Sequence, residues 1–262
     1  MPAGAAAYDD FARGVSANER ADNDLAVSSF TAALQAGDLA PALVPAAYRG
    51  RGLAYLRSEN CVSALSDLTA ALTLAPSDIE STKLRARAAF CSGNLALADS
   101  DFGAVIAKDP KNAAAHMGRG RVRWRLQNFT VAQSDFESVM QVVPKYQYAV
   151  LWDEMVRLRI GTLDVKAAAD AASQFYEDDW PQPVLALFGG KNTPQKVLAL
   201  AAKGDDKDLQ GRICEANFYV GEWLLGSSDQ SAAKASLEAA AAHCPKNYIE
   251  YDESHAELDR LK

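Results

Sequence analysis

The chain has 262 residues, of which 49% are hydrophobic and 23% are charged. This is the composition of an ordinary globular protein, and it excludes an intrinsically disordered chain. No run of about 18 apolar residues occurs, so the sequence predicts no transmembrane helix. The formal net charge of −7 argues against broad binding of nucleic acids.

A repeat of 34 residues runs through the first half of the chain. Prolines stand at this spacing at positions 76, 110 and 144. Small and large apolar residues keep the same spacing in two further series, which are Ala64, Ala98 and Ala132, and Leu68, Phe102 and Phe136. An earlier unit, with Gly14 and Phe30, repeats the pattern 38 residues upstream of Gly52 and Leu68.

Each repeated position has a physical reason. Small residues allow two antiparallel helices to approach closely, and the larger residue fills the space between neighbouring hairpins. The proline ends the second helix, because its ring and its missing N–H prevent continuation. In length and pattern this unit resembles the tetratricopeptide repeat. The expected fold is therefore an all-α, superhelical solenoid of antiparallel helix hairpins.

The repeat pattern divides the chain into three expected parts. Residues 7–146 hold about four repeats, residues 147–213 hold divergent helical pairs, and residues 214–262 hold a last repeat and a capping helix. A short helix is predicted to begin at Thr193 and Pro194, an N-cap followed by proline. The capping helix is predicted over residues 248–261, with four acidic side chains turned to water: Asp252, Glu253, Glu257 and Asp259.

Two sequence blocks in the second half of the chain point to a particular family of repeat proteins. The block from Trp180 to Gly190, followed by the block from Cys214 to Glu222, resembles the bacterial NlpI lipoprotein family. The resemblance implies a homodimer at the periplasmic side of the outer membrane. It also implies an adaptor for a periplasmic protease and for peptidoglycan-cleaving enzymes. No lipobox cysteine precedes residue 8, so a lipid anchor is not evident in this chain.

The sequence predicts neither an enzyme nor a metal or cofactor site. His116, His243 and His255 stand apart from one another and from cysteine partners, unlike the ligands of a metal site. His116 is expected on the surface. No nucleophile elbow and no phosphate-binding loop occurs.

The four cysteines fall at positions that favour two disulfides. Cys214 and Cys244 are positions 1 and 31 of one repeat, which lie at the same end of a helical hairpin. Cys61 opens the second helix of one repeat, and Cys91 ends the first helix of the next. Pairs Cys61–Cys91 and Cys214–Cys244 would suit an oxidising compartment, whereas four buried thiols are the alternative.

The first helices of successive repeats are expected to line a concave groove that binds a protein partner. Segment 45–126 carries a net charge of +5, while the rest of the chain carries −12, so an acidic peptide would fit such a groove. The predicted groove residues are Arg49, Leu53, Arg57, Lys83, Arg87, Phe90, Met117, Arg121, Trp124 and Arg125. The alternating arginines at 119, 121, 123 and 125 point in different directions on a helix, so no phosphate-tracking stripe is expected.

The predicted function is a non-enzymatic adaptor of the periplasm or cell envelope that binds proteins or peptides through this groove. The alternative is a generic, co-chaperone-like interaction module of the cytoplasm. A homodimer is also expected, because the first helix, with Tyr8 and Phe11, leaves the N-terminal end of the solenoid poorly covered.

Overall fold

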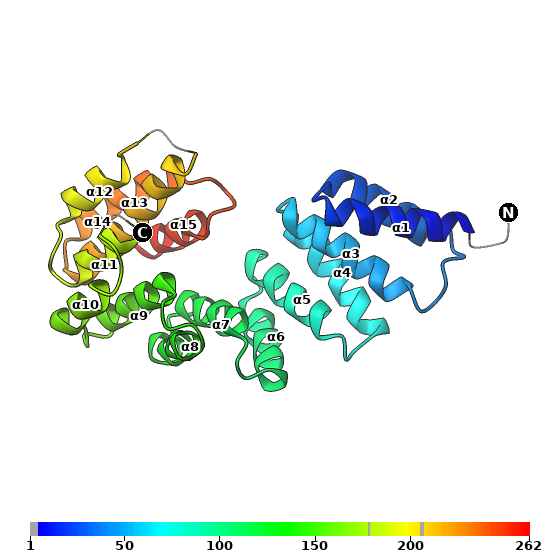
Figure 1. The fold of residues 1–262 in the computed structure, drawn as a ribbon, viewed down its shortest axis with the longest axis horizontal. Helices are drawn as coiled ribbons and strands as arrows, with labels where there is room; N and C mark the ends of the chain where they lie inside the picture. Colours follow the sequence, from blue (N-terminus) through cyan, green and yellow to red (C-terminus); the bar gives the residue numbers. More distant parts are fainter. Residues whose placement is uncertain (1–4, 178, 205–206) are drawn as a thin grey trace. The chain divides into compact units, whose positions relative to one another are not determined.

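The structure is a computed structural model that describes residues 5–177, 179–204 and 207–262. These residues contain α-helices and no β-strand (Figure 1). The helices are α1 (Ala5–Glu19), α2 (Asn23–Gln35), α3 (Val44–Arg57), α4 (Cys61–Leu74), α5 (Ile79–Cys91), α6 (Leu95–Lys108), α7 (Ala113–Arg125), α8 (Phe129–Val142), α9 (Gln147–Arg159), α10 (Val165–Ala172), α11 (Gln182–Phe188), α12 (Pro194–Ala201), α13 (Leu209–Gly226), α14 (Gln230–His243) and α15 (Ile249–Arg260).

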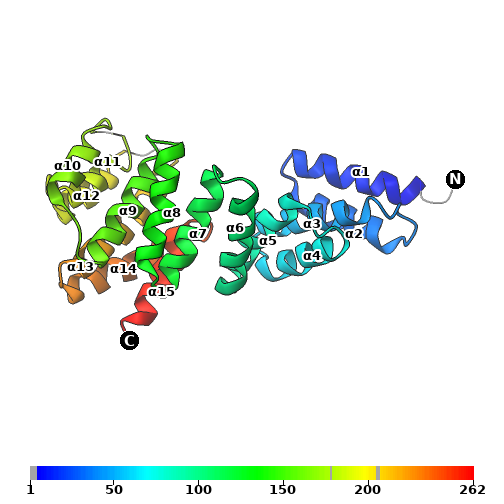
Figure 2. The same cartoon turned by 90° about the horizontal axis from the view of Figure 1, so that it is seen from below.

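The chain forms two compact units, Met1–Val122 and Arg123–Lys262. Their boundary lies inside α7, whereas the sequence places the end of the clear repeats at residue 146. In the first unit α1 pairs with α2, α3 with α4, and α5 with α6, and each hairpin packs on the next (Figures 1 and 2). This is the predicted arrangement of antiparallel hairpins.

The second helices end shortly before the predicted prolines and begin at side-chain caps. Pro76, Pro110 and Pro144 each lie two residues beyond the last residue of a second helix, α4, α6 or α8. The second helices begin at side-chain caps: Asn60 accepts a hydrogen bond from the N–H of Ser63, and Asn94 accepts one from Leu97. Such caps satisfy backbone donors that have no partner inside the helix.

Large and small residues fit together in the core of the first unit. Phe102 lies against Gly118, where an added Cβ would stand 2.4 Å from the Phe102 ring. Phe30 lies against Gly50 in the same way, again at 2.4 Å. One repeat before Phe102 the equivalent residue is Leu68. The buried cluster that contains Leu68 packs against a leucine, Leu84, at the position equivalent to Gly118. The residue on the second helix and its neighbour on the next hairpin are therefore matched in size, as close packing requires.

A repeated aspartate holds each hairpin together through an arginine. Asp67 accepts two hydrogen bonds from Arg51, at 2.7 and 2.8 Å, and Asp101 accepts two from Arg85, at 2.7 and 2.9 Å. The two carboxylates are buried. Each bidentate arginine–aspartate pair joins the first and second helix of its repeat. This role explains why an aspartate recurs every 34 residues.

The second unit is built around α9 and α13, which pack on each other. Trp152 of α9 lies at its centre, stacked on Phe136 with the ring centroids 5.6 Å apart. Helices α14 and α15 continue from α13, as Figure 1 shows, and α11 packs on α9 and α13. All seven residues of α11 are buried, although the sequence indicates only a break before it. Thr193 caps α12 as predicted, accepting from the N–H of Lys196. No helix among the described residues has both the length and the apolar character needed to span a membrane.

Candidate protein-binding surfaces

The predicted groove residues of the first unit lie on α3, α5 and α7. Arg57 is exposed and donates to the carbonyl of Asn18 at 2.8 Å. Arg49 forms an ion pair with Asp78 at 2.6 Å, and the half-buried Leu53 follows one turn later on the same helix. Two of the arginines predicted to bind a partner are thus partly engaged within the protein itself.

Helix α5 carries the most available cation of this surface. Arg87 is exposed, and the structure gives it no ion-pair partner among the described residues. Lys83, one turn earlier, pairs with Glu80 at 2.6 Å on the exposed side of the helix. Phe90, one turn later, is half-buried.

Helix α7 contacts α5 through a cation and an aromatic ring. The Arg121 guanidinium lies 5.1 Å from the centroid of the Phe90 ring, a favourable cation–π distance. Met117, one turn before Arg121, is half-buried. Arg87, Phe90, Met117 and Arg121 together are called the α5–α7 face below. This face offers positive charge beside aromatic and thioether groups, which suits an acidic segment with an apolar side chain.

Two predicted groove residues do not belong to an open surface. Trp124 is fully buried, with its ring 4.9 Å from that of Phe129 and 5.5 Å from that of Trp152. Arg125 is paired with the buried Glu253 at 2.7 Å. The prediction that Trp124 and Arg125 bind a partner is therefore wrong for this conformation, because aromatic packing and an internal ion pair occupy both side chains.

The alternating arginines of α7 contact different helices, as predicted. The nearest atom to a Cβ added at Gly103 of α6 belongs to Arg119, and Arg121 lies over Phe90 of α5. Arg123 pairs with Asp135 of α8 at 2.7 Å, and Arg125 pairs with Glu253 of α15. These four side chains therefore do not form one row of positive charge that could follow a nucleic-acid backbone.

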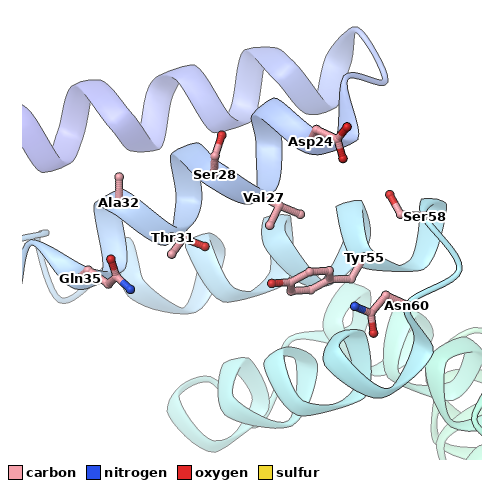
Figure 3. Close-up of a pocket in the computed structure, with 9 residues that line it drawn as sticks. All are labelled: Asp24, Val27, Ser28, Thr31, Ala32, Gln35, Tyr55, Ser58 and Asn60. Carbon is pink, nitrogen blue, oxygen red and sulfur yellow. The ribbon is translucent and has the colours of Figure 1, made fainter.

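A shallow hollow lies on α2, beside the end of α3. Its volume is about 610 Å³. Figure 3 shows the ring of Tyr55 between α2 and Asn60, and the hydroxyl groups of Ser28 and Thr31 on α2. Asp24 is the only ionisable carboxylate of its lining. The hollow therefore offers hydroxyl, amide and carboxylate groups beside the Tyr55 ring.

The second unit contains a buried polar network that sequence reasoning missed. Glu250, Glu253 and Glu257 of α15 are all buried, so the prediction that Glu253 and Glu257 face water is wrong. Their partners are Tyr219, Arg125 and Arg159, which lie between 31 and 128 residues earlier in the chain. These acids are three and four residues apart, so they lie on one helix face. This spacing is the feature of the sequence that could have indicated a shared buried environment.

Glu215 lies in the same network. It accepts hydrogen bonds from the indole N–H of Trp180 at 2.6 Å and from the hydroxyl of Tyr148 at 2.9 Å. Burial, together with the nearby Glu250, raises the pKa of Glu215 to about 7. The two hydrogen bonds oppose this rise, because they stabilise the ionised form.

The structure joins Cys61 to Cys91 and Cys214 to Cys244, the two pairs that the repeat positions indicate. The Cα atoms are 5.9 and 4.7 Å apart, within the range of protein disulfides. The first bond ties the start of α4 to the end of α5, and the second ties α13 to the end of α14. The oxidation state of these cysteines in the cell stays a prediction.

His116 is buried, contrary to the surface position predicted for it. Its ring nitrogen Nε2 lies 3.1 Å from the carbonyl oxygen of Pro110. The histidine therefore fastens the turn before α7 to that helix. Across residues 5–177, 179–204 and 207–262, no group of three potential ligands is placed to hold a metal ion.

Two stretches between residues 11 and 139 match a known family, and nearly the whole chain matches known folds. Residues 11–79 and 83–139 match the family model of the tetratricopeptide repeat. A tetratricopeptide repeat protein from Parabacteroides merdae is 18% identical, with a TM-score of 0.68 over 97% of this chain and 100% of the other. The apo form of RapI is 11% identical, with a TM-score of 0.70 over 97% and 99%.

A third similar structure holds a ligand. The Rap conjugation gene regulator of plasmid pLS20, solved in complex with the Phr* peptide, is 15% identical. Its TM-score is 0.55 over 97% of this chain and 75% of that one. At such identities these likenesses concern the fold alone. The fold is a tetratricopeptide-repeat helical solenoid, an architecture that generally binds proteins or peptides.

Proposed function

We propose that this tetratricopeptide-repeat protein is a scaffold that binds an acidic segment of a partner protein on its α5–α7 face. The observation that carries the proposal is the exposed Arg87, which has no ion-pair partner among the described residues and lies one turn from the Phe90–Arg121 contact. An acidic side chain of a partner would pair with Arg87, and an apolar neighbour would pack on Phe90 and Met117. The peptide bound in the Rap regulator is compatible with such a use of this fold.

The proposed location is the bacterial cell envelope, where the protein acts as an adaptor for a periplasmic protease and for peptidoglycan hydrolases. Two features support this. The blocks 180–190 and 214–222 resemble the NlpI lipoprotein family, and the four cysteines form two pairs of a kind that persists in oxidising compartments. An interaction module of the cytoplasm is the competing function.

The thiol state in cells separates these two locations. Cells are quenched with acid, the chain is unfolded without reductant, and free thiols are tagged with a maleimide of known mass. The envelope location predicts no tag on the purified chain. Four tags per chain would support the cytoplasmic alternative and would overturn the proposed compartment.

A charge reversal tests the α5–α7 face. Peptides are first selected from a displayed random library on the wild-type chain, and we expect aspartate and glutamate to be enriched among them. The double variant Arg87→Glu/Arg121→Glu should then bind the selected peptides about tenfold more weakly at low salt, with a smaller loss at high salt.

The matched control makes the same change of charge elsewhere. Lys108 and Lys111 are exposed, at the end of α6 and in the following turn. Lys108→Glu/Lys111→Glu should retain most of the affinity, since long-range attraction alone is screened by salt. Equal losses in both variants, or selected peptides without acidic residues, would remove the α5–α7 face from the proposal.

A homodimer through α1 completes the proposal. Tyr8 and Val15 lie seven residues apart on one side of α1, and they are 56% and 39% exposed. The variant Tyr8→Lys/Val15→Lys should halve the particle mass in light scattering, from twice the 28.1 kDa chain mass to once that mass. Val62→Lys on α4 changes a residue that is 73% exposed and serves as the control. A wild-type chain that scatters as a monomer at tens of micromolar would contradict the dimer.

A further inference from the structure

Helix α15 buries acids where a helix normally buries apolar residues. Its four buried residues are Glu250, Glu253, Ser254 and Glu257. They follow the spacing of three and four residues that places side chains on one helix face. No apolar residue of α15 is fully buried. The fully buried contacts of this helix are therefore made by polar side chains.

The partners of this acidic face come from three other helices of the second unit. Arg125 of α7 donates to Glu253 at 2.7 Å, and Arg159 of α9 donates to Glu257 at 2.9 Å. Tyr219 of α13 donates its hydroxyl hydrogen to Glu250 at 2.9 Å. Arg260, at the end of α15, donates back to the carbonyl of Arg125 at 2.6 Å. Helix α15 thus bridges helices that lie far apart in the sequence.

The face beneath α15 has the chemistry of a binding site for an acidic helix. The Arg159 guanidinium lies 5.5 Å from the centroid of the Trp124 ring, which in turn packs against Trp152. Rigid aromatic rings and planar guanidinium groups are the side chains most enriched at the energetic centres of protein interfaces. Here the guanidinium of Arg159 is paired with Glu257 of α15, and the Trp124 ring is fully buried.

The polar character of the contact makes exchange feasible. Ion pairs taken out of water contribute little net free energy, because the cost of removing the charges from water offsets their attraction. The Cys214–Cys244 bond ends immediately before this segment and ties α14 to α13. The bond therefore holds α13 and α14 together whether or not α15 is in place.

We propose that α15 is an internal ligand of the face formed by Arg125, Arg159 and Tyr219, and that an acidic helix of a partner protein displaces it. The partner helix carries carboxylates four residues apart, in place of Glu253 and Glu257. This surface belongs to the second unit and is independent of the α5–α7 face of the first. The chain therefore has a second binding surface that stays covered until such a helix is present.

Hydrogen exchange on the intact chain tests this proposal. The probe is a synthetic peptide of residues 245–262, labelled with heavy isotopes so that its fragments differ in mass from those of the chain. A tethered helix competes at an effective concentration on the order of millimolar, so the peptide is added at about 1 mM and above. We expect α15 to exchange about tenfold faster in its presence, while α13 and α14 keep their protection.

A second peptide provides the charge control. It carries Glu253→Gln and Glu257→Gln, which retain size and polarity but remove the charges that pair with Arg125 and Arg159. This peptide should leave the exchange of α15 unchanged. The proposal is overturned if neither peptide changes α15, if both do so equally, or if α13 and α14 open together with α15.

A full-length variant gives an independent measurement. Glu253→Gln/Glu257→Gln in the chain should loosen α15 and raise the affinity for the unmodified peptide about tenfold, measured by fluorescence anisotropy. Tryptophan fluorescence and circular dichroism establish whether the second unit of the variant is folded. If it is not, the exchange experiment on the wild-type chain decides alone.

Discussion

The pairing of Phe102 with Gly118 allows a sharp test of how the first unit packs. The change is Gly118→Ala, which places a methyl group 2.4 Å from the Phe102 ring, far inside van der Waals contact. Overpacking of this kind costs about 1–3 kcal/mol, and the better helix propensity of alanine returns about 1 kcal/mol. We therefore expect a net loss of about 1 kcal/mol.

The second change, Phe102→Leu, removes ring volume from the same contact. Alone it should cost about 1–2 kcal/mol through the space it leaves. Combined with Gly118→Ala, it makes room for the new methyl group, in the direction of the Leu68–Leu84 pair one repeat earlier. The double variant should be more stable than the sum of the single changes by about 1–2 kcal/mol, as expected for residues in contact.

Urea unfolding followed by circular dichroism measures these free energies. The four tryptophans all lie in residues 124–223, so their fluorescence reports only on the second unit and identifies any change there. Gly103→Ala on α6 is the control, because its added Cβ would meet only Arg119, at 3.7 Å. This change should stabilise the chain by about 0.5–1 kcal/mol. Additive effects of Phe102→Leu and Gly118→Ala, within about 0.5 kcal/mol, would refute the size-matching argument.

Three further predictions concern charges and cysteines. Asp101→Ala should lower the free energy of unfolding by about 2–3 kcal/mol, because it leaves the partly buried Arg85 without its ion-pair partner. Asp170→Ala removes a partner from an ion pair that is exposed on both sides, so it should change this free energy by less than about 0.5 kcal/mol. Similar losses for the two variants in urea unfolding would contradict this prediction. Burial and the neighbouring Asp153 raise the pKa of Glu154 to about 7 from 4.5, so the folded chain binds more protons than the unfolded chain and stability falls as the pH rises from about 5 to about 8. Glu215, whose pKa is raised to a similar value, contributes in the same direction. Glu154→Gln should therefore reduce the pH dependence of the tryptophan-monitored unfolding midpoint without abolishing it, and an unchanged slope would rule out this carboxyl as a contributor. Reduction of the two disulfides, each closing a loop of 30 residues, should lower the unfolding free energy by about 3 kcal/mol per bond, and an identical urea midpoint with and without reductant would show that no stabilising bond was present.

The sequence by itself determined the class of fold, because the relevant interactions are local and repeated. Pro76, Pro110 and Pro144 end helices wherever they stand, and Ala64 and Leu68 face their neighbours through helix periodicity alone. Cysteine positions within the repeat likewise indicated the pairs that the structure joins. The arginines of α7 were expected to diverge, and they do, since a helix turns by a constant angle per residue.

Only the tertiary structure decided which charged and aromatic residues are available to a partner. Glu253 and Glu257 follow the pattern of a solvated helix face, and they are buried because Arg125 and Arg159, 128 and 98 residues away, meet them. Trp124 occupies a groove position in the repeat, yet the rings of Phe129 and Trp152 enclose it. Periodicity specifies the side of a helix on which a residue lies. Whether that side meets water or another helix depends on how closely the hairpins curve together, which no local pattern encodes.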